Sequence, residues 1–103
     1  MPIHVLITGG TFDKEYNELT GELFFKDTHL TEMLRLGRSN LEIDIQTLMM
    51  IDSLQMTPAD RDAIAARCLA LPGEQIVITH GTDTMAETAA VLGKVAQGKT
   101  IVL

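Results

Sequence analysis

Apolar residues along the chain gather into four short runs that are typical of buried strands. These runs cover residues 3–7, 41–48, 75–79 and 100–103. Three of them are mostly apolar, as in strands buried on both faces. Residues 41–48 instead alternate between apolar and polar side chains, as in a half-buried strand. The pattern therefore predicts four main strands.

Apolar residues at helical spacing predict three helices between these strands. Thr28 and Thr57 are the expected N-caps of the first two, and Pro58 suits the first position of the second. The helical segments, counted from these caps, cover residues 28–36, 57–71 and 85–97. Strands that alternate with helices imply right-handed crossovers and a parallel sheet covered on both faces. We therefore expect an α/β fold of three layers, α/β/α, with a mostly parallel sheet.

A long polar segment, residues 11–27, separates the first strand from the first helix. It contains a turn signal at residues 17–21, followed by the apolar run Leu23-Phe24-Phe25. A connection of this length inside a compact domain is usually functional or mobile. The segment is thus expected to form a short hairpin or a covering flap.

Composition and charge exclude several classes of protein. The 103 residues carry a net charge of −6, which disfavours a nucleic-acid binder with a basic face. No apolar run approaches the roughly 18 residues of a membrane span, and the N-terminus does not resemble a signal peptide. The single cysteine, Cys68, excludes an internal disulfide and favours a reducing compartment; its place on an apolar helix face favours an inert core thiol. The chain ends in the apolar run Ile101-Val102-Leu103, so we expect more chain to follow.

Two polar clusters follow predicted strands and carry the candidate chemistry. They are Thr8-Gly9-Gly10-Thr11-Phe12 and His80-Gly81-Thr82-Asp83-Thr84-Met85. Ligands of open α/β sheets bind beyond the C-terminal ends of the strands, and a hydroxyl nucleophile needs a neighbouring base and an orienting group. The alternatives are a plain strand-exit turn for the first cluster and a simple helix cap for Asp83.

Three segments resemble the signature sequences of bacterial-type L-asparaginases. They are T-G-G-T at residues 8–11, D-S-L-Q-M-T-P at residues 52–58 and H-G-T-D-T-M at residues 80–85. The middle segment is similar to the cytoplasmic type. The resemblance covers residues 1–103 as a Rossmann-like N-terminal domain, incomplete at its C-terminus. It implies hydrolysis of the side-chain amide of L-asparagine, or a related amide, to aspartate and ammonia in the cytoplasm. It also implies a homodimer or homotetramer, no metal or organic cofactor, and neither nucleic acid nor membrane as a partner.

The resemblance also implies catalytic roles, carried over by position. Thr11 is the expected nucleophile. Thr82 is the expected second catalytic threonine, which positions the attacking water or relays a proton. Asp83 is also expected to be catalytic, in a Thr-Asp-Lys arrangement whose lysine lies beyond residue 103. Tyr16 is the candidate for the tyrosine of the active-site flap, which residues 12–27 would form.

Substrate-binding roles follow in the same way. Asp83 is expected to bind the α-ammonium group of the substrate, and Ser53 its α-carboxylate. Backbone N–H groups near Gly81 and Thr82 are expected to stabilise the oxyanion. Gly10 and Gly81 complete the expected substrate-binding set.

Two departures from the family pattern matter. Leu54 occupies a position where many members have glutamine, which leaves the preferred amide substrate open. The catalytic lysine and the partner domain of the family are not within residues 1–103, which leaves a second hypothesis open. The alternative is a catalytically impaired domain that binds a small amino acid or dicarboxylate without turnover. A nucleotide-binding regulator would need a phosphate-binding loop, and neither the Gly-Lys-Ser/Thr pattern nor a full G-x-G-x-x-G is present.

Overall fold

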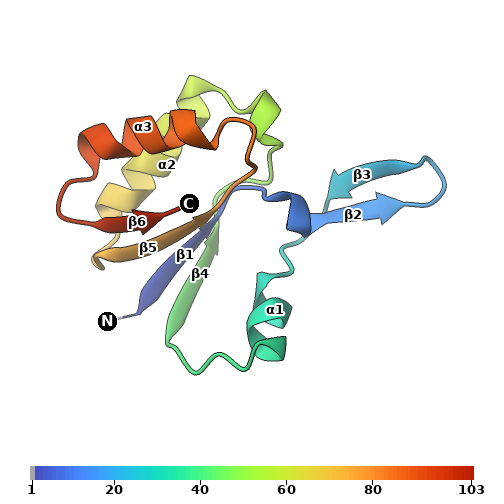
Figure 1. Ribbon diagram of the computed structural model, residues 1–103, viewed down its shortest axis with the longest axis horizontal. Coiled ribbons are helices and arrows are strands. Elements are labelled where there is room, and N and C mark those ends of the chain that lie inside the picture. The colour runs from blue at the N-terminus through green and yellow to red at the C-terminus, as the bar shows by residue number, and fades with distance from the viewer. Residues whose placement is uncertain (1) are drawn as a thin grey trace.

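Four parallel strands form the central sheet of the computed structural model, which describes residues 2–103 (Figure 1). Their order across the sheet is β4-β1-β5-β6. The strands are β1 (Ile3–Ile7), β4 (Ile43–Thr47), β5 (Gln75–Thr79) and β6 (Thr100–Val102). The predicted α/β fold with a mostly parallel sheet is therefore confirmed.

The connections include three helices, two 3-10 turns and a hairpin. The helices are α1 (Leu30–Leu36), α2 (Pro58–Ala70) and α3 (Met85–Val95). The 3-10 turns are η1 (Thr11–Asp13) and η2 (Ser53–Gln55), and the hairpin pairs β2 (Lys14–Asn17) with β3 (Glu22–Phe25). None of the described helices has the length and apolar character needed to cross a membrane.

The strand order creates a switch point between β1 and β5. From β1 the chain moves outward to β4, whereas from β4 it returns across β1 to β5 and continues to β6. Right-handed crossovers then place α1 on one face of the sheet and α2 and α3 on the other. Figure 1 shows α2 and α3 together above the sheet and α1 apart from them, beyond β4. Because the loops after β1 and β5 diverge, the crevice between their C-terminal ends is the expected ligand site.

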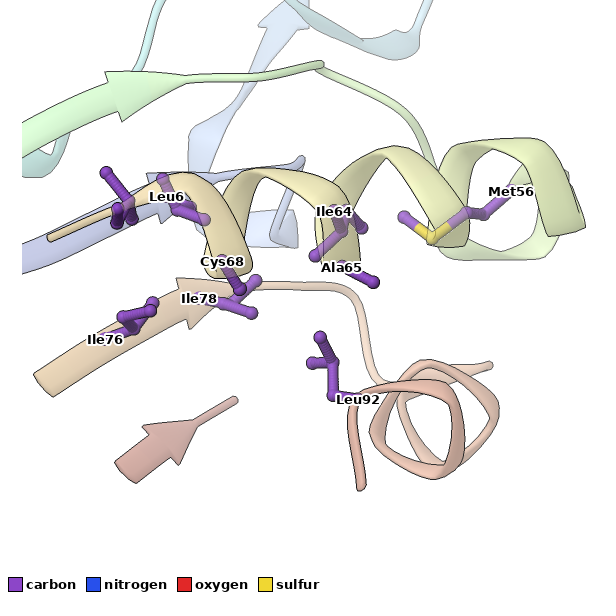
Figure 2. Close-up of a cluster of buried hydrophobic side chains, with 9 residues drawn as sticks. Leu6, Met56, Ile64, Ala65, Cys68, Ile76, Ile78 and Leu92 are labelled. Atoms are coloured by element: carbon purple, nitrogen blue, oxygen red, sulfur yellow. The ribbon is translucent and has the colours of Figure 1, made fainter. Parts of the chain in front are cut away.

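One apolar cluster joins the sheet to α2 and α3 (Figure 2). Leu6, Ile76 and Ile78 are at most 1% exposed and face α2 and α3. Burying an aliphatic side chain of this size contributes about 1.5–3 kcal/mol. The two helices complete this cluster with Ile64, Ala65, Cys68 and Leu92, and the preceding loop adds Met56. Cys68 is fully buried, and burial raises the pKa of its thiol, which agrees with an inert core cysteine.

The opposite face of the sheet has much thinner cover. Helix α1 spans seven residues, and none of them is buried. Val77 of β5 and Val102 of β6 are 37% and 57% exposed. The second helical layer within residues 2–103 is therefore slight, because a two-turn helix cannot cover four strands.

The N-cap of α2 is the predicted residue, whereas the N-cap of α1 is not. Thr57 is the N-cap of α2, as predicted, and the structure adds a full capping box with Asp60. At α1 the N-cap is His29, not Thr28. The Thr28 hydroxyl lies between the carboxylate of Asp13, to which it donates, and the backbone N–H of Leu30, from which it accepts.

Candidate active site

The three signature segments meet at the C-terminal edge of the sheet. Thr8, just after β1, donates its backbone N–H to the carbonyl of Thr79 at 3.2 Å and accepts one from Ile51 at 3.1 Å. Thr84 donates its hydroxyl to the carbonyl of Ser53 at 2.8 Å. The segments after β1, β4 and β5 are thus bonded to one another, as their positions in the sequence predicted.

Glycines allow this close approach of backbones. Gly9 has φ of +121°, and a Cβ there would lie 2.4 Å from the carbonyl oxygen of Ile51. Only glycine fits such a position without moving the neighbouring loop. Gly10 is buried between the ring of Phe12 and the backbone of His80. Gly10 therefore lies where the first and third segments face each other.

Thr11 begins η1 directly after this glycine pair. Its side chain is exposed, and its hydroxyl has no hydrogen-bond partner within residues 2–103. Its carbonyl oxygen accepts a hydrogen bond from the backbone N–H of Lys14. The backbone at Thr11 is thus fixed while its hydroxyl stays available.

Ser53 is the most enclosed of the candidate residues. It is 1% exposed, and its Oγ has no hydrogen-bond partner in the described part of the chain. A Cβ placed on Gly81 would lie 2.7 Å from that oxygen, so Ser53 faces the backbone of the third segment. A buried hydroxyl without a partner costs about 1–3 kcal/mol, which a ligand oxygen would offset.

Thr82 and Asp83 are both exposed on the turn between β5 and α3. The N-cap of α3 is Thr84, so the alternative that Asp83 is only a helix cap is wrong. Over residues 2–103 the Asp83 carboxylate has neither an ion pair nor a hydrogen bond, and the residue is exposed. Asp83 is therefore free to bind a cationic group.

His80 orients the turn that carries these two residues. Its Nδ1 contacts the carbonyl oxygen of Gly81, and its Nε2 lies 2.8 Å from the hydroxyl of Thr88. Thr88 is fully buried and donates to the sulfur of Met56 at 3.7 Å. Both ring nitrogens are thus engaged, as expected for an orienting residue rather than a general base. Across the described residues, no three His, Cys, Asp or Glu side chains gather as metal ligands would.

An ion pair that the sequence did not reveal joins the hairpin to the middle segment. Lys14 Nζ lies 2.7 Å from Asp52 Oδ2 and 5.3 Å from the centre of the Phe25 ring. The other oxygen of Asp52 accepts the backbone N–H of Leu54 at 3.0 Å. The Lys14 ammonium is the main cause that lowers the pKa of the Asp52 carboxyl. This pair borders a pocket of about 260 Å³ beneath the hairpin, lined also by Met50 and Gln55.

Tyr16 lies on the hairpin, which projects away from the sheet in Figure 1. The strand register places Tyr16 opposite Leu23, on the same hairpin face as Lys14 and Phe25. Its side chain is 61% exposed, and within residues 2–103 it is not hydrogen-bonded to Thr11. The predicted hairpin is therefore confirmed, whereas this conformation does not bring Tyr16 to the other candidate residues.

The chain matches a known protein family and is similar to several solved structures. The family model for the asparaginase N-terminal domain matches residues 2–103. The structure is similar to the thermostable L-asparaginase from Thermococcus kodakarensis, with a TM-score of 0.72 and 30% identity over 89% of this chain and 29% of that one. The structure is also similar to L-asparaginase I from Vibrio cholerae, with a TM-score of 0.65 and 28% identity over 89% of this chain and 30% of that one.

A third similar structure is the probable cytoplasmic L-asparaginase from Campylobacter jejuni. Its TM-score is 0.65, with 30% identity over 85% of this chain and 29% of that one. This chain thus spans less than a third of the length of each of these relatives. The family model matches residues 2–103, nearly the whole chain, so the chain belongs to the asparaginase N-terminal domain family.

Proposed function

We propose that the protein carrying this chain hydrolyses the side-chain amide of L-asparagine, or of a related amino-acid amide, to a carboxylate and ammonia. The observation that supports the proposal is that the segments carrying Thr11, Ser53, Thr82 and Asp83 are hydrogen-bonded to one another at the C-terminal edge of the sheet. Each of these four residues leaves a hydroxyl or carboxylate free of hydrogen bonds within residues 2–103.

Opposite ends of the site suit the two charged groups of an amino acid. The Asp83 carboxylate would pair with the α-ammonium group, a charge-assisted contact that selects amino acids over simple amides. The unpartnered Ser53 hydroxyl would donate to the α-carboxylate. Gly10 and Gly81 carry no side chain here; a Cβ on Gly10 would lie 2.8 Å from the Phe12 ring, and one on Gly81 would lie 2.7 Å from Ser53 Oγ, so a side chain at either position would crowd this region.

Chemistry would proceed through an ester on Thr11. The Thr11 oxygen attacks the amide carbon and gives up its proton, the C–N bond breaks, and the nitrogen takes up that proton and leaves as ammonia. Water, positioned by Thr82, then attacks the ester carbon and releases the acid with the free threonine. Backbone N–H groups near Gly81 and Thr82 would hold the oxyanion, a contribution typically of a few kcal/mol. Closure of the hairpin with Tyr16 would exclude water during the first step.

Substitution of the two threonines in the intact native protein tests this proposal. Thr11→Val and Thr82→Val should each lower ammonia release from L-asparagine by roughly a thousandfold or more, since each removes a reacting hydroxyl. Thr31→Val is the matched control, because Thr31 is exposed on α1, away from the site. Full turnover by a folded Thr11→Val protein would rule out the nucleophile.

Binding without turnover is the second candidate function. It is favoured by one observation: within residues 2–103 no basic side chain is hydrogen-bonded to the Thr11 or Thr82 hydroxyl, so neither has an activating partner there. Calorimetry with L-aspartate, combined with an ammonia assay on the native protein, separates the two functions. Binding with no ammonia release would favour the second.

We also propose that the native protein assembles as a homodimer or homotetramer in the cytoplasm. The sparse cover of the sheet face that carries Val77 and Val102 supports an additional packing partner, and the single reduced cysteine supports the compartment. A monomeric mass in light scattering of the native protein would contradict the assembly.

A further inference from the structure

We infer that Lys14 sets the preference for substrates with a free carboxylate, because it neutralises Asp52 beside Ser53. This inference rests on the proposed function and adds a specificity-determining residue to it. The Asp52 carboxylate lies at the start of η2, one residue before the hydroxyl proposed to bind the α-carboxylate. Without a cation there, two negative charges would meet in this corner of the site.

The contacts of Lys14 show how firmly the cation is held. Its ammonium group lies 2.7 Å from Asp52 Oδ2 and above the Phe25 ring, and its side chain is only 18% exposed. Asp52 is 33% exposed and is held in place by the backbone N–H of Leu54. Partial burial limits screening by salt, so this pair differs from an ordinary surface ion pair.

The charge of the surroundings makes this neutralisation matter. The chain has a net charge of −6, and Asp83 adds an unpaired carboxylate to the site. In the part of the chain described here, Lys14 is the cation that pairs with a carboxylate of the three signature segments. Asp83 suits the substrate ammonium, whereas Asp52 would repel the substrate carboxylate. Neutralising Asp52 alone therefore gives the site opposite preferences at its two ends.

Lys14 also connects two of the segments mechanically. Its backbone N–H binds the carbonyl of Thr11, while its ammonium binds Asp52 on the middle segment. A substitution of Lys14 keeps its backbone N–H but removes the link to Asp52. It therefore has two routes of action, a loosened backbone at Thr11 and a changed charge. The two effects differ in one measurable way, since only the charge effect depends on whether the substrate has a carboxylate.

The experiment uses the intact native protein with Lys14→Met, Asp52→Asn and the double variant. Asparagine at position 52 still offers an oxygen to the N–H of Leu54, so η2 keeps its cap. KM is measured for L-asparagine and for its α-methyl ester, which keeps the ammonium group but lacks the carboxylate charge, and Kd for L-aspartate by calorimetry. Lys14→Met should raise the KM for L-asparagine and the Kd for L-aspartate by roughly three- to tenfold, the range expected for an unscreened like charge at a partly exposed site.

The double variant should restore both constants to within about twofold of the native values, because it removes the repelling carboxylate as well. The KM for the methyl ester should stay within about twofold throughout. Lys14→Arg, which keeps the charge, should behave like the native protein. Arg35→Met is the control, since Arg35 forms an exposed ion pair with Glu32 on α1, away from the site.

Distinct outcomes overturn the inference and the proposed function. Equal losses with both substrates, or no recovery in the double variant, would overturn the charge role of Lys14 while turnover persists. A native protein that binds L-aspartate without releasing ammonia would overturn hydrolysis, and the Kd values would still test Lys14. A native protein that binds neither compound would overturn both. Thermal unfolding of each variant shows whether it has folded.

Discussion

The hydroxyl of Thr84 donates a hydrogen bond of 2.8 Å to the carbonyl oxygen of Ser53. Thr84 is the N-cap of α3, yet its side chain makes no capping bond to that helix. It joins the third segment to the second instead. The missing capping bond destabilises the start of α3 by about 1 kcal/mol. In exchange, the Thr84 hydroxyl holds the second and third segments in a fixed geometry.

The same two segments approach so closely at Gly81 that no side chain fits there. A Cβ on Gly81 would lie 2.7 Å from Ser53 Oγ and 3.1 Å from Ser53 Cβ. We therefore expect Gly81→Ala to lower the free energy of unfolding by about 1–3 kcal/mol, as is typical when a packed site is overfilled. Urea denaturation measures this loss, and calorimetry should show weaker binding of L-aspartate because Ser53 is displaced.

Gly93 provides the matched control on α3. A Cβ at Gly93 meets no atom within 4 Å, and the residue lies inside the helix. Gly93→Ala should therefore raise the free energy of unfolding by about 0.5–1 kcal/mol, since alanine favours the helix. If Gly81→Ala were as stable as the native protein, Gly81 and Ser53 would not be packed closely enough to exclude a side chain at position 81.

Local patterns were sufficient to predict the frame of this fold. Strands β1 and β5 have the predicted bounds, because short apolar runs followed by glycine or a polar turn leave little alternative. The start of α2 was equally clear, since Thr57 and Pro58 act through neighbours in the sequence. The polar clusters after β1 and β5 could be predicted because they come directly after parallel strands, which end at one edge of the sheet, whereas Ser53 followed from the resemblance to the family.

Local sequence patterns could not predict contacts between residues that are distant in the sequence. Lys14 and Asp52 are 38 positions apart, and nothing in either local sequence marks them as partners. Thr28 has the sequence of an N-cap, but its hydroxyl binds the buried carboxylate of Asp13, 15 positions away. An amphipathic stripe on α1 likewise indicates an apolar face without showing that its residues stay unburied.

Acid should weaken the fold through Asp44, at the edge of the sheet far from the site. Asp44 Oδ2 lies 3.0 Å from Nδ1 of the buried His4, and this hydrogen bond lowers the pKa of the Asp44 carboxyl below its ordinary value of 3.8. A lowered pKa in the folded state stabilises the fold fully at pH values above 3.8. This contribution is lost as the pH falls through the lower, folded-state pKa.

Urea denaturation between about pH 5 and pH 2 measures this dependence. The native protein should lose stability more steeply over this range than Asp44→Asn, which has no carboxyl to titrate at that position. Asp62→Asn is the control, because Asp62 is exposed on α2 and, within residues 2–103, forms no ion pair. Identical pH profiles for the native protein and Asp44→Asn would show that the His4 contact contributes nothing.

Ser53 offers the sharpest separation of stability from binding. Its buried hydroxyl has no partner within residues 2–103, so Ser53→Ala removes an unsatisfied polar group and no hydrogen bond. We expect the free energy of unfolding to stay unchanged or to rise by up to about 1 kcal/mol, while the Kd for L-aspartate rises roughly tenfold or more. Thr88→Val is the matched comparison, because that equally buried hydroxyl binds His80 and its loss should cost about 1–3 kcal/mol. If Ser53→Ala destabilised the protein as much as Thr88→Val, the Ser53 hydroxyl would serve the fold rather than a ligand.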